Sequence, residues 1–257
     1  MDDVVAILSR DRVWSAYLLA DTETPFVQHS HFFIDTSDRE PAVVLLYQHP
    51  SFSAVGAYGS ANGLWRVVNR VPVWPRTALL LVQPPALDVF QSIYKTVSVL
   101  PTLRMSVTAE MFRPMARCPT RFLAPADLPA LNDLLGQYAD SAFTVDQLED
   151  GVFAAVVDPA SPSRFLSVAG THVWCRKHRI AAVGNVFTRP DVRGRGYAEA
   201  TTSAVTGHLL GHGCDDVVLN VREVNTTAIR LYERLGYRTT CHFFEGTATA
   251  RTGVAMD

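Results

Sequence analysis

Several features that mark specialised protein classes are missing from this sequence of 257 residues. It has four cysteines, and no two of them have the close spacing of a zinc site or a Cys-x-x-Cys motif. The longest apolar runs, such as residues 78–82, have the length of a strand and are far too short to span a membrane. The acidic start, Met1-Asp2-Asp3, lacks the basic and apolar regions of a secretory signal. We therefore expect a cytoplasmic protein with reduced thiols and no membrane segment.

An excess of charge of one sign is also missing. The chain has 23 basic and 25 acidic residues, a net charge of −2, and no overall field that would attract nucleic acid or an anionic membrane. Hydrophobic residues make up 48% of the chain, which excludes a disordered protein and supplies a sizeable core. A chain of this length corresponds to one or two domains.

The first part of the sequence predicts alternating helices and strands. Residues 26–35 and 42–49 are rich in Val, Phe, Leu and Tyr and flank a polar turn, which is typical of a β-hairpin. Helices are predicted at 4–19, 61–69 and 84–94, and strands at 26–35, 42–49, 77–83 and 103–108. Prolines and arginines gather between 111 and 125, which indicates a domain boundary.

The second part of the sequence repeats this order of elements without a clear sequence repeat. Helices are predicted at 126–137, 143–152, 196–211 and 226–235, and strands at 153–157, 165–175, 180–188, 216–221 and 237–244. The common order favours duplication of one α/β unit.

A glycine-rich, basic loop joins the predicted strand 180–188 to the helix after it. Gly194 and Gly196 allow a ligand to approach the backbone, and Arg193 and Arg195 add positive charge at a helix N-terminus. The pattern is not a P-loop, and Glu199 occupies the position of the third glycine of a dinucleotide fingerprint. The loop therefore predicts a site for a diphosphate, although an ordinary surface loop has the same composition.

A second pattern follows the loop at a characteristic distance. Arg193-x-x-Gly196-x-Ala198, with the later run Asn225, Ala228, Leu231, Tyr232, Gly236 and Tyr237, resembles the GNAT superfamily of acetyl-CoA-dependent N-acetyltransferases, and in particular its FR47-like branch. The motif covers about 50 residues, and the order of elements extends the resemblance over roughly 117–246.

The resemblance implies an α/β (α+β) fold with a mixed, mainly antiparallel sheet flanked by helices, in two tandem units. Residues 1–112 would form a degenerate copy, because their comparable stretch, Gly56-Ala57-Tyr58-Gly59-Ser60-Ala61, has no basic residue. Residues 117–257 would form the catalytic domain that binds acetyl-CoA. Trp14, Tyr17, Trp65 and Trp74 are candidates either for the acceptor pocket or for the core.

The resemblance also implies which residues bind the cofactor. The strand end would bond the pantetheine arm, the loop amides and arginines would hold the diphosphate, and strand amides near Phe187 would polarise the thioester carbonyl. The residues assigned to the cofactor are Val186, Phe187, Thr188, Arg193, Gly194, Arg195, Gly196, Tyr197, Ala198, Asn220, Asn225 and Tyr232. Asn225 is equally suited to cap the helix that follows it, and Gly236 to end that helix.

Two residues are candidates for proton transfer. In the GNAT pattern Tyr232 would protonate the leaving thiolate, although its ring can also serve simply as core packing. The strand 180–186 lacks the glutamate that many family members use as a base, so the base would be water or His172, which can also be a hydrogen-bonded strand residue. Asn185 is placed either in the acceptor pocket or at a local bulge. His208 and His212 have the spacing of two zinc ligands but no evident third ligand, and are interpreted as a solvated helix face.

The sequence thus predicts an enzyme that transfers an acetyl group from acetyl-CoA to a primary amine of a small molecule in a ternary complex. The alternatives are a CoA-binding regulatory or scaffold protein and a protein N-terminal or lysine acetyltransferase. No nucleic-acid or membrane partner and no metal is expected. A monomer is favoured over a homodimer, because tandem units can bury the surface that single domains use to dimerise.

Overall fold

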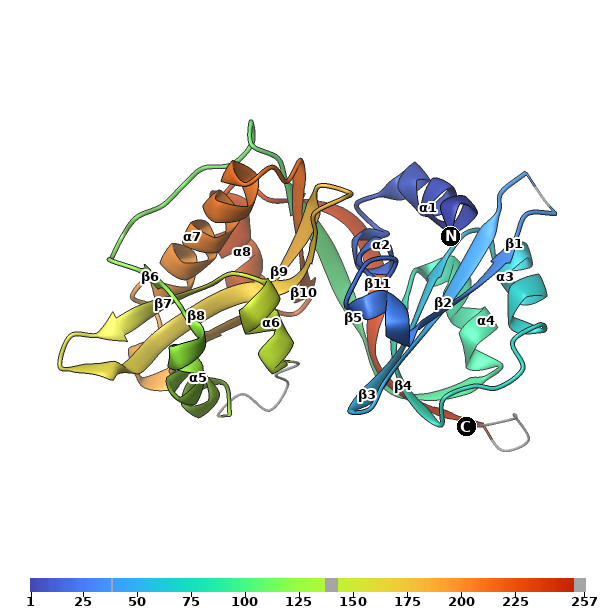
Figure 1. Ribbon diagram of the computed structural model, residues 1–257, viewed down its shortest axis with the longest axis horizontal. Coiled ribbons are helices and arrows are strands. Elements are labelled where there is room, and N and C mark those ends of the chain that lie inside the picture. The colour runs from blue at the N-terminus through green and yellow to red at the C-terminus, as the bar shows by residue number, and fades with distance from the viewer. Residues whose placement is uncertain (38, 137–142, 252–257) are drawn as a thin grey trace. The chain divides into compact units, whose positions relative to one another are not determined.

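The computed structural model describes residues 1–37, 39–136 and 143–251 (Figure 1). The chain forms two compact units: unit 1 comprises Met1–Arg104 and Thr240–Asp257, and unit 2 comprises Met105–Thr239. The division between the units therefore comes before the predicted boundary, and the last strand, predicted for the second domain, belongs mainly to unit 1. None of the helices in the described ranges is long and apolar enough to cross a bilayer.

Unit 1 contains a sheet in the order β1-β2-β3-β4-β11-β5. Its strands are β1 (Ser30–Asp35), β2 (Ala42–His49), β3 (Phe52–Tyr58), β4 (Thr77–Val82) and the greater part of β5 (Tyr94–Val107) and β11 (Arg238–Ala250). Its helices are α1 (Asp2–Leu8), α2 (Ala16–Ala20), α3 (Ala61–Val68) and α4 (Pro84–Gln91). β3 and β4 are parallel, whereas the pairs β1–β2, β2–β3 and β4–β11 are antiparallel.

Several predictions for unit 1 were wrong in detail, among them the strand predicted at 103–108, which begins at Tyr94. The helix predicted over 4–19 is divided into α1, a 3-10 turn at Ser9–Asp11 and α2. The Asp11 side chain accepts a hydrogen bond from the Trp14 backbone at 3.0 Å, a local bond that competes with a continuous helix. The strand β3 was not predicted, because its small residues and glycine give a weak strand pattern.

Unit 2 contains a sheet in the order β5-β10-β9-β8-β7-β6, in which β5 contributes its final residues. The strands are β6 (Arg121–Phe122), β7 (Phe153–Asp158), β8 (Ser161–Cys175), β9 (Ile180–Thr188) and β10 (Asp216–Arg222). The helices are α5 (Leu128–Leu135), α6 (Val145–Asp150), α7 (Tyr197–Gly211) and α8 (Thr226–Arg234). β9 and β10 are parallel, whereas β6–β7, β7–β8 and β8–β9 are antiparallel. This confirms the predicted mixed, mainly antiparallel sheet.

The core of unit 2 forms where α5 packs on the sheet. Leu131, Leu134 and Leu135 have helical spacing and meet a cluster of strand residues, Phe153, Phe165, Val168 and Phe187. Figure 1 shows α5 and α6 across the sheet from α7. Gln137, the last residue of the helix predicted here, lies outside the described residues.

Candidate functional site

The two parallel strands of unit 2 separate toward their carboxyl ends. β9 and β10 pair in register over four residue pairs, from Ile180–Asp216 to Val183–Leu219. The remaining residues of both strands, 184–188 and 220–222, lie beyond the last of these pairs. Strand edges that separate in this way expose backbone groups to an extended ligand.

The predicted anion loop lies at the end of β9. Gly194 and Gly196 have φ angles of +76° and +79°, in the left-handed region that favours glycine. Gly196 is the N-cap of α7, and within the described chain no side chain caps the amides of this helix. The first-turn amides, including those of Tyr197 and Ala198, and the positive end of the helix dipole are therefore available to an anion.

The two arginines of the loop have different surroundings. Arg193 donates from Nε to the carbonyl oxygen of Thr188 at 3.2 Å, which ties the loop to the end of β9. Arg195 is exposed, and the described residues give it neither a hydrogen bond nor an ion pair. The structure thus brings β9, both arginines and the helix N-terminus to one place.

The pairing of β8 with β9 contains two irregularities beside this opening. Asn185 and Val186 lie opposite the single residue Ala169, and Asn185 has a φ of +51°. His172 is the extra residue of a second shift, between the pairs Thr171–Val183 and Val173–Ala182. Bulges re-aim side chains and are frequent next to active sites. The bulge that the sequence offered as one role of Asn185 is confirmed.

His172 occupies the space that a side chain at Gly184 would fill. A Cβ on Gly184 would lie 2.4–2.6 Å from imidazole atoms of His172. Asn185 hydrogen-bonds the imidazole and donates from Nδ2 to Oε1 of Gln147 at 2.9 Å. Burial lowers the pKa of His172, and the bond to Asn185 opposes that shift only in part. The neutral ring, which is the form that accepts a proton, therefore predominates at neutral pH.

Tyr232 is buried on α8, with 6% of its surface exposed. Its ring lies edge-on to Tyr237 at a centroid distance of 6.0 Å, and the Tyr237 hydroxyl bonds Oγ1 of Thr206 at 2.7 Å. The packing that the sequence offered as one role of Tyr232 is confirmed, and the acid role stays a prediction.

The remaining predicted residues lie around α8 and the open end of β10. Asn225 is the N-cap of α8 and accepts a hydrogen bond from the Ala228 amide at 3.2 Å, so its capping role is confirmed. Gly236 follows the helix with a φ of +96°, as predicted for a residue that ends it. Asn220 is half-buried on β10, just beyond the last pair with β9.

Comparison with known proteins assigns this arrangement to a family. Residues 168–244, which contain β9, the arginine loop, α7 and α8, match the family model of FR47-like proteins. A tandem GNAT protein from the clavulanic acid biosynthesis pathway superposes with a TM-score of 0.54 at 11% identity, covering 96% of this chain and 95% of that one. Residues 168–244 are thus FR47-like, and the fold of the chain is similar to that of a tandem GNAT protein.

Curated proteins similar to this chain are named acetyltransferases. A mycothiol acetyltransferase of Streptomyces coelicolor is 28% identical over 79% of this chain and 70% of its own length. A protein of the same name from Thermobispora bispora is 38% identical over 31% of this chain, but the match spans only 30% of that relative. The family model and these relatives thus show similarity to GNAT acetyltransferases, and this chain spans less than a third of the length of the Thermobispora bispora relative.

Sequence reasoning missed Gln147, which contacts both Asn185 and His172. Its Oε1 accepts from both Asn185 and the Thr144 backbone amide, and its Nε2 donates to the His172 carbonyl oxygen at 3.5 Å. The pattern Thr144-x-x-Gln147 is a capping signature that predicts the helix start. Nothing local in the sequence indicates that the same glutamine meets β8 and β9.

The histidine pair predicted as a solvated helix face is half-buried at His208 and exposed at His212. The rings of His208 and His212 stack at 3.8 Å, and both lie edge-on to Trp174. No third donor joins the pair among the described residues.

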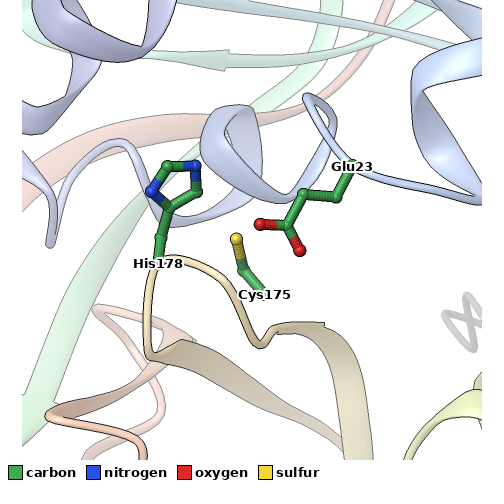
Figure 2. Close-up of side chains that lie close together, drawn as sticks. All are labelled: Glu23, Cys175 and His178. Carbon is green, nitrogen blue, oxygen red and sulfur yellow. The ribbon is translucent and has the colours of Figure 1, made fainter.

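A cysteine and a histidine lie close together at the end of β8. Figure 2 shows Cys175 as the last residue of β8 and His178 in the turn after it. The third residue labelled there, Glu23, belongs to unit 1. All four cysteines are free thiols, as expected.

Proposed function

We propose that unit 2 transfers an acetyl group from acetyl-CoA to a primary amine of a small molecule. The observation that carries the proposal is the opening between β9 and β10 directly before an uncapped helix N-terminus with two arginines. An extended pantetheine arm fits the first feature and a diphosphate fits the second. The relatives named mycothiol acetyltransferase support a small-molecule acceptor.

The cofactor would lie along the end of β9 and over the loop. Backbone groups of residues 186–188 would bond the pantetheine arm, with Asn220 and Asn225 lining the opposite side. The amides of residues 193–198 would hold the diphosphate, with charge from Arg193 and Arg195. When bound, acetyl-CoA supplies the activated thioester. The chain holds its carbonyl near the β9 bulge, where backbone amides can stabilise negative charge on the oxygen.

Transfer would proceed by direct attack in the ternary complex. The amine nitrogen forms a bond to the thioester carbonyl carbon, and the carbon–sulfur bond then breaks. Tyr232 gives its hydroxyl proton to the leaving thiolate, and His172 takes the proton that the amine loses. The imidazole stands over Gly184, so β8 supplies a base at the place where β9 has no carboxylate. The hydrogen bond between Asn185 and the imidazole keeps the ring in that position, and Gln147 accepts a hydrogen bond from Asn185.

Calorimetric titration of the full chain with acetyl-CoA tests the cofactor site. We expect one site per chain with micromolar affinity, weakened at least about tenfold in Arg193→Ala/Arg195→Ala, because charged hydrogen bonds to phosphate are lost. Arg179→Ala is the matched control, since Arg179 lies at the opposite end of β9 and pairs with Asp215. Absence of binding at millimolar acetyl-CoA would contradict the proposal.

Turnover of Tyr232→Phe separates an enzyme from a CoA-binding scaffold. With an amine identified by library screening, the variant should lose about 10²-fold in kcat, because only the proton donor is removed. Its affinity for acetyl-CoA should remain that of the wild type. Unchanged kcat in Tyr232→Phe would assign the leaving-group proton to another donor.

A further inference from the structure

A buried carboxylate lies in the first turn of α7, beside the loop. Glu199 is 1% exposed and forms ion pairs with Nε of Arg234 at 2.7 Å and Nε of Arg117 at 3.3 Å. The two arginine side chains are about half exposed, at 51% and 52%. One buried negative charge therefore holds two guanidinium groups at the surface of unit 2.

Arg117 lies directly against the N-cap of α7. A Cβ on Gly196 would come within 3.1 Å of Cδ of Arg117. Arg117 belongs to the segment between β5 and β6, far from the loop in sequence and outside the motif that predicted the cofactor site. The fold thus brings a third arginine to the place where Gly196 leaves the backbone exposed.

The charge of the proposed cofactor exceeds what the loop motif supplies. Coenzyme A carries a diphosphate and a ribose phosphate monoester, the latter alone contributing roughly −1.5 to −2 near neutral pH. Arg193 and Arg195 provide two positive charges, and Arg193 is already bonded to Thr188. Arg117 and Arg234 add two more against the single charge of Glu199. A guanidinium has five donors, so a carboxylate contact leaves donors for a second anion.

We propose that Arg117, positioned by Glu199, binds a phosphate group of coenzyme A at this loop, with Arg234 as a supporting donor. The inference rests on the proposed use of acetyl-CoA by unit 2. It adds a phosphate-binding residue that neither the sequence motif nor the family match identifies. The shared chemistry is a phosphate ester, which can be the diphosphate or the ribose phosphate of the same cofactor.

Three ligands test this assignment in the full-length protein. Dissociation constants are measured for acetyl-CoA, acetyl-dephospho-CoA, which lacks the ribose phosphate, and acetyl-pantetheine, which contains no phosphate group. Arg117→Met should weaken binding of acetyl-CoA about tenfold and leave that of acetyl-pantetheine unchanged. If the loss persists with the dephospho ligand, Arg117 contacts the diphosphate; if it disappears, Arg117 contacts the ribose phosphate. Arg179→Met, at the other end of β9, is the control.

The direction in which Glu199→Gln changes the affinity for acetyl-CoA distinguishes a positioning role of Glu199 from a purely electrostatic effect. Removal of a negative charge near the loop would by itself strengthen anion binding. If Glu199 positions Arg117, the same substitution should weaken acetyl-CoA binding several-fold, because the arginine is no longer held over Gly196. Tighter binding in Glu199→Gln would overturn the positioning role. Thermal unfolding of each variant checks that the protein remains folded.

Two further outcomes would overturn the proposal itself. Equal losses for acetyl-CoA and acetyl-pantetheine in Arg117→Met would show a structural effect, and wild-type affinity for acetyl-CoA would show no contact. Both differ from failure of the proposed function, in which the wild-type protein itself does not bind acetyl-CoA.

Discussion

The same strand–loop–helix arrangement occurs in both units, yet of these two copies only that in unit 2 has, among the described residues, a helix N-terminus without a side-chain cap. In unit 1, β3 leads through Gly59 and Ser60 into α3, and the next strand, β4, lies parallel to β3. In unit 2, β9 leads through the arginine loop into α7, and β10 lies parallel to β9. The side chains that surround these two equivalent strand–loop–helix arrangements can therefore be compared.

The helix start is closed in unit 1. Ser60 caps α3 by accepting a hydrogen bond from the Gly63 amide at 3.2 Å. A Cβ on Gly59 would lie 2.5 Å from the Pro41 carbonyl oxygen, so backbone occupies the space over this turn. At Gly194 of unit 2, by contrast, a Cβ would meet no described atom within 4 Å.

In unit 1 a buried tryptophan packs at the end of the β3–β4 pair. Trp14 is 1% exposed, donates from Nε1 to the Ala57 carbonyl oxygen at 3.0 Å and packs with Leu81 and Phe243. Its core role, one of the two that the sequence offered, is therefore confirmed. Leu18 lies over Gly56 of β3, whereas the polar ring of His172 lies over Gly184 of β9. The same backbone arrangement is therefore filled by apolar core side chains in unit 1 and bordered by a polar side chain in unit 2.

Among the substitutions that test this comparison, Trp14→Ala should cause the largest change, a loss of stability in unit 1. Removal of a fully buried tryptophan should destabilise unit 1 by about 3–5 kcal/mol, because a cavity and an unpaired carbonyl remain. Denaturant unfolding measures the loss, and Trp65→Ala, at a site that is 40% exposed, is the control with a small effect. The number of acetyl-CoA sites should remain one per chain, because unit 1 has no arginine loop. Binding of acetyl-CoA at a second site in Trp14→Ala would mean that the Trp14 side chain alone prevents binding in unit 1.

The pH dependence of catalysis should report on His172. Its pKa is lowered, and the protonated ring cannot accept a proton, so kcat/KM should fall as the pH decreases through that lowered value. The loss should begin below the ordinary histidine pKa of about 6.5 and reach tenfold for each further pH unit. His172→Gln should be slower and lose this acidic limb, whereas an unchanged limb would assign it to another group.

Two glycines of the loop provide a matched pair. Gly194→Ala and Gly196→Ala should each cost roughly 1–2 kcal/mol, because both positions have a left-handed backbone. Only the methyl group at 196 would also press on the Arg117 side chain. Calorimetry should therefore show a greater loss of acetyl-CoA affinity in Gly196→Ala than in Gly194→Ala. Equal losses would indicate that the position of Arg117 does not affect binding.

Ser60→Ala should have the smallest effect. Loss of the cap should destabilise unit 1 by about 1 kcal/mol, measured by thermal unfolding. Although the substitution frees an amide of α3, we expect no binding of acetyl-CoA at unit 1. Ser60→Asp, which retains the cap, should restore stability.

Local patterns in the sequence were sufficient for most elements around the site. The strand β9 was predicted with its observed limits, and the N-cap at Asn225 and the left-handed Gly236 were also predicted. Each of these features depends on neighbouring residues only. The division of the helix at 4–19 beside the Asp11–Trp14 bond was not predicted, and β3 was missed because its strand pattern is weak.

By itself the sequence determined the glycine-arginine loop, most of the elements around it and the resemblance to the family. These follow from backbone requirements and periodicities that a few adjacent residues satisfy. Only the tertiary structure decided that His172 covers Gly184, that Gln147 reaches Asn185 and that Arg117 meets Glu199. Such meetings depend on bulges and strand register, where a shift of one residue turns a side chain to the opposite face. The packing of Trp14 against β3 in unit 1 has the same cause, because Trp14 and Ala57 come into contact only in the folded chain.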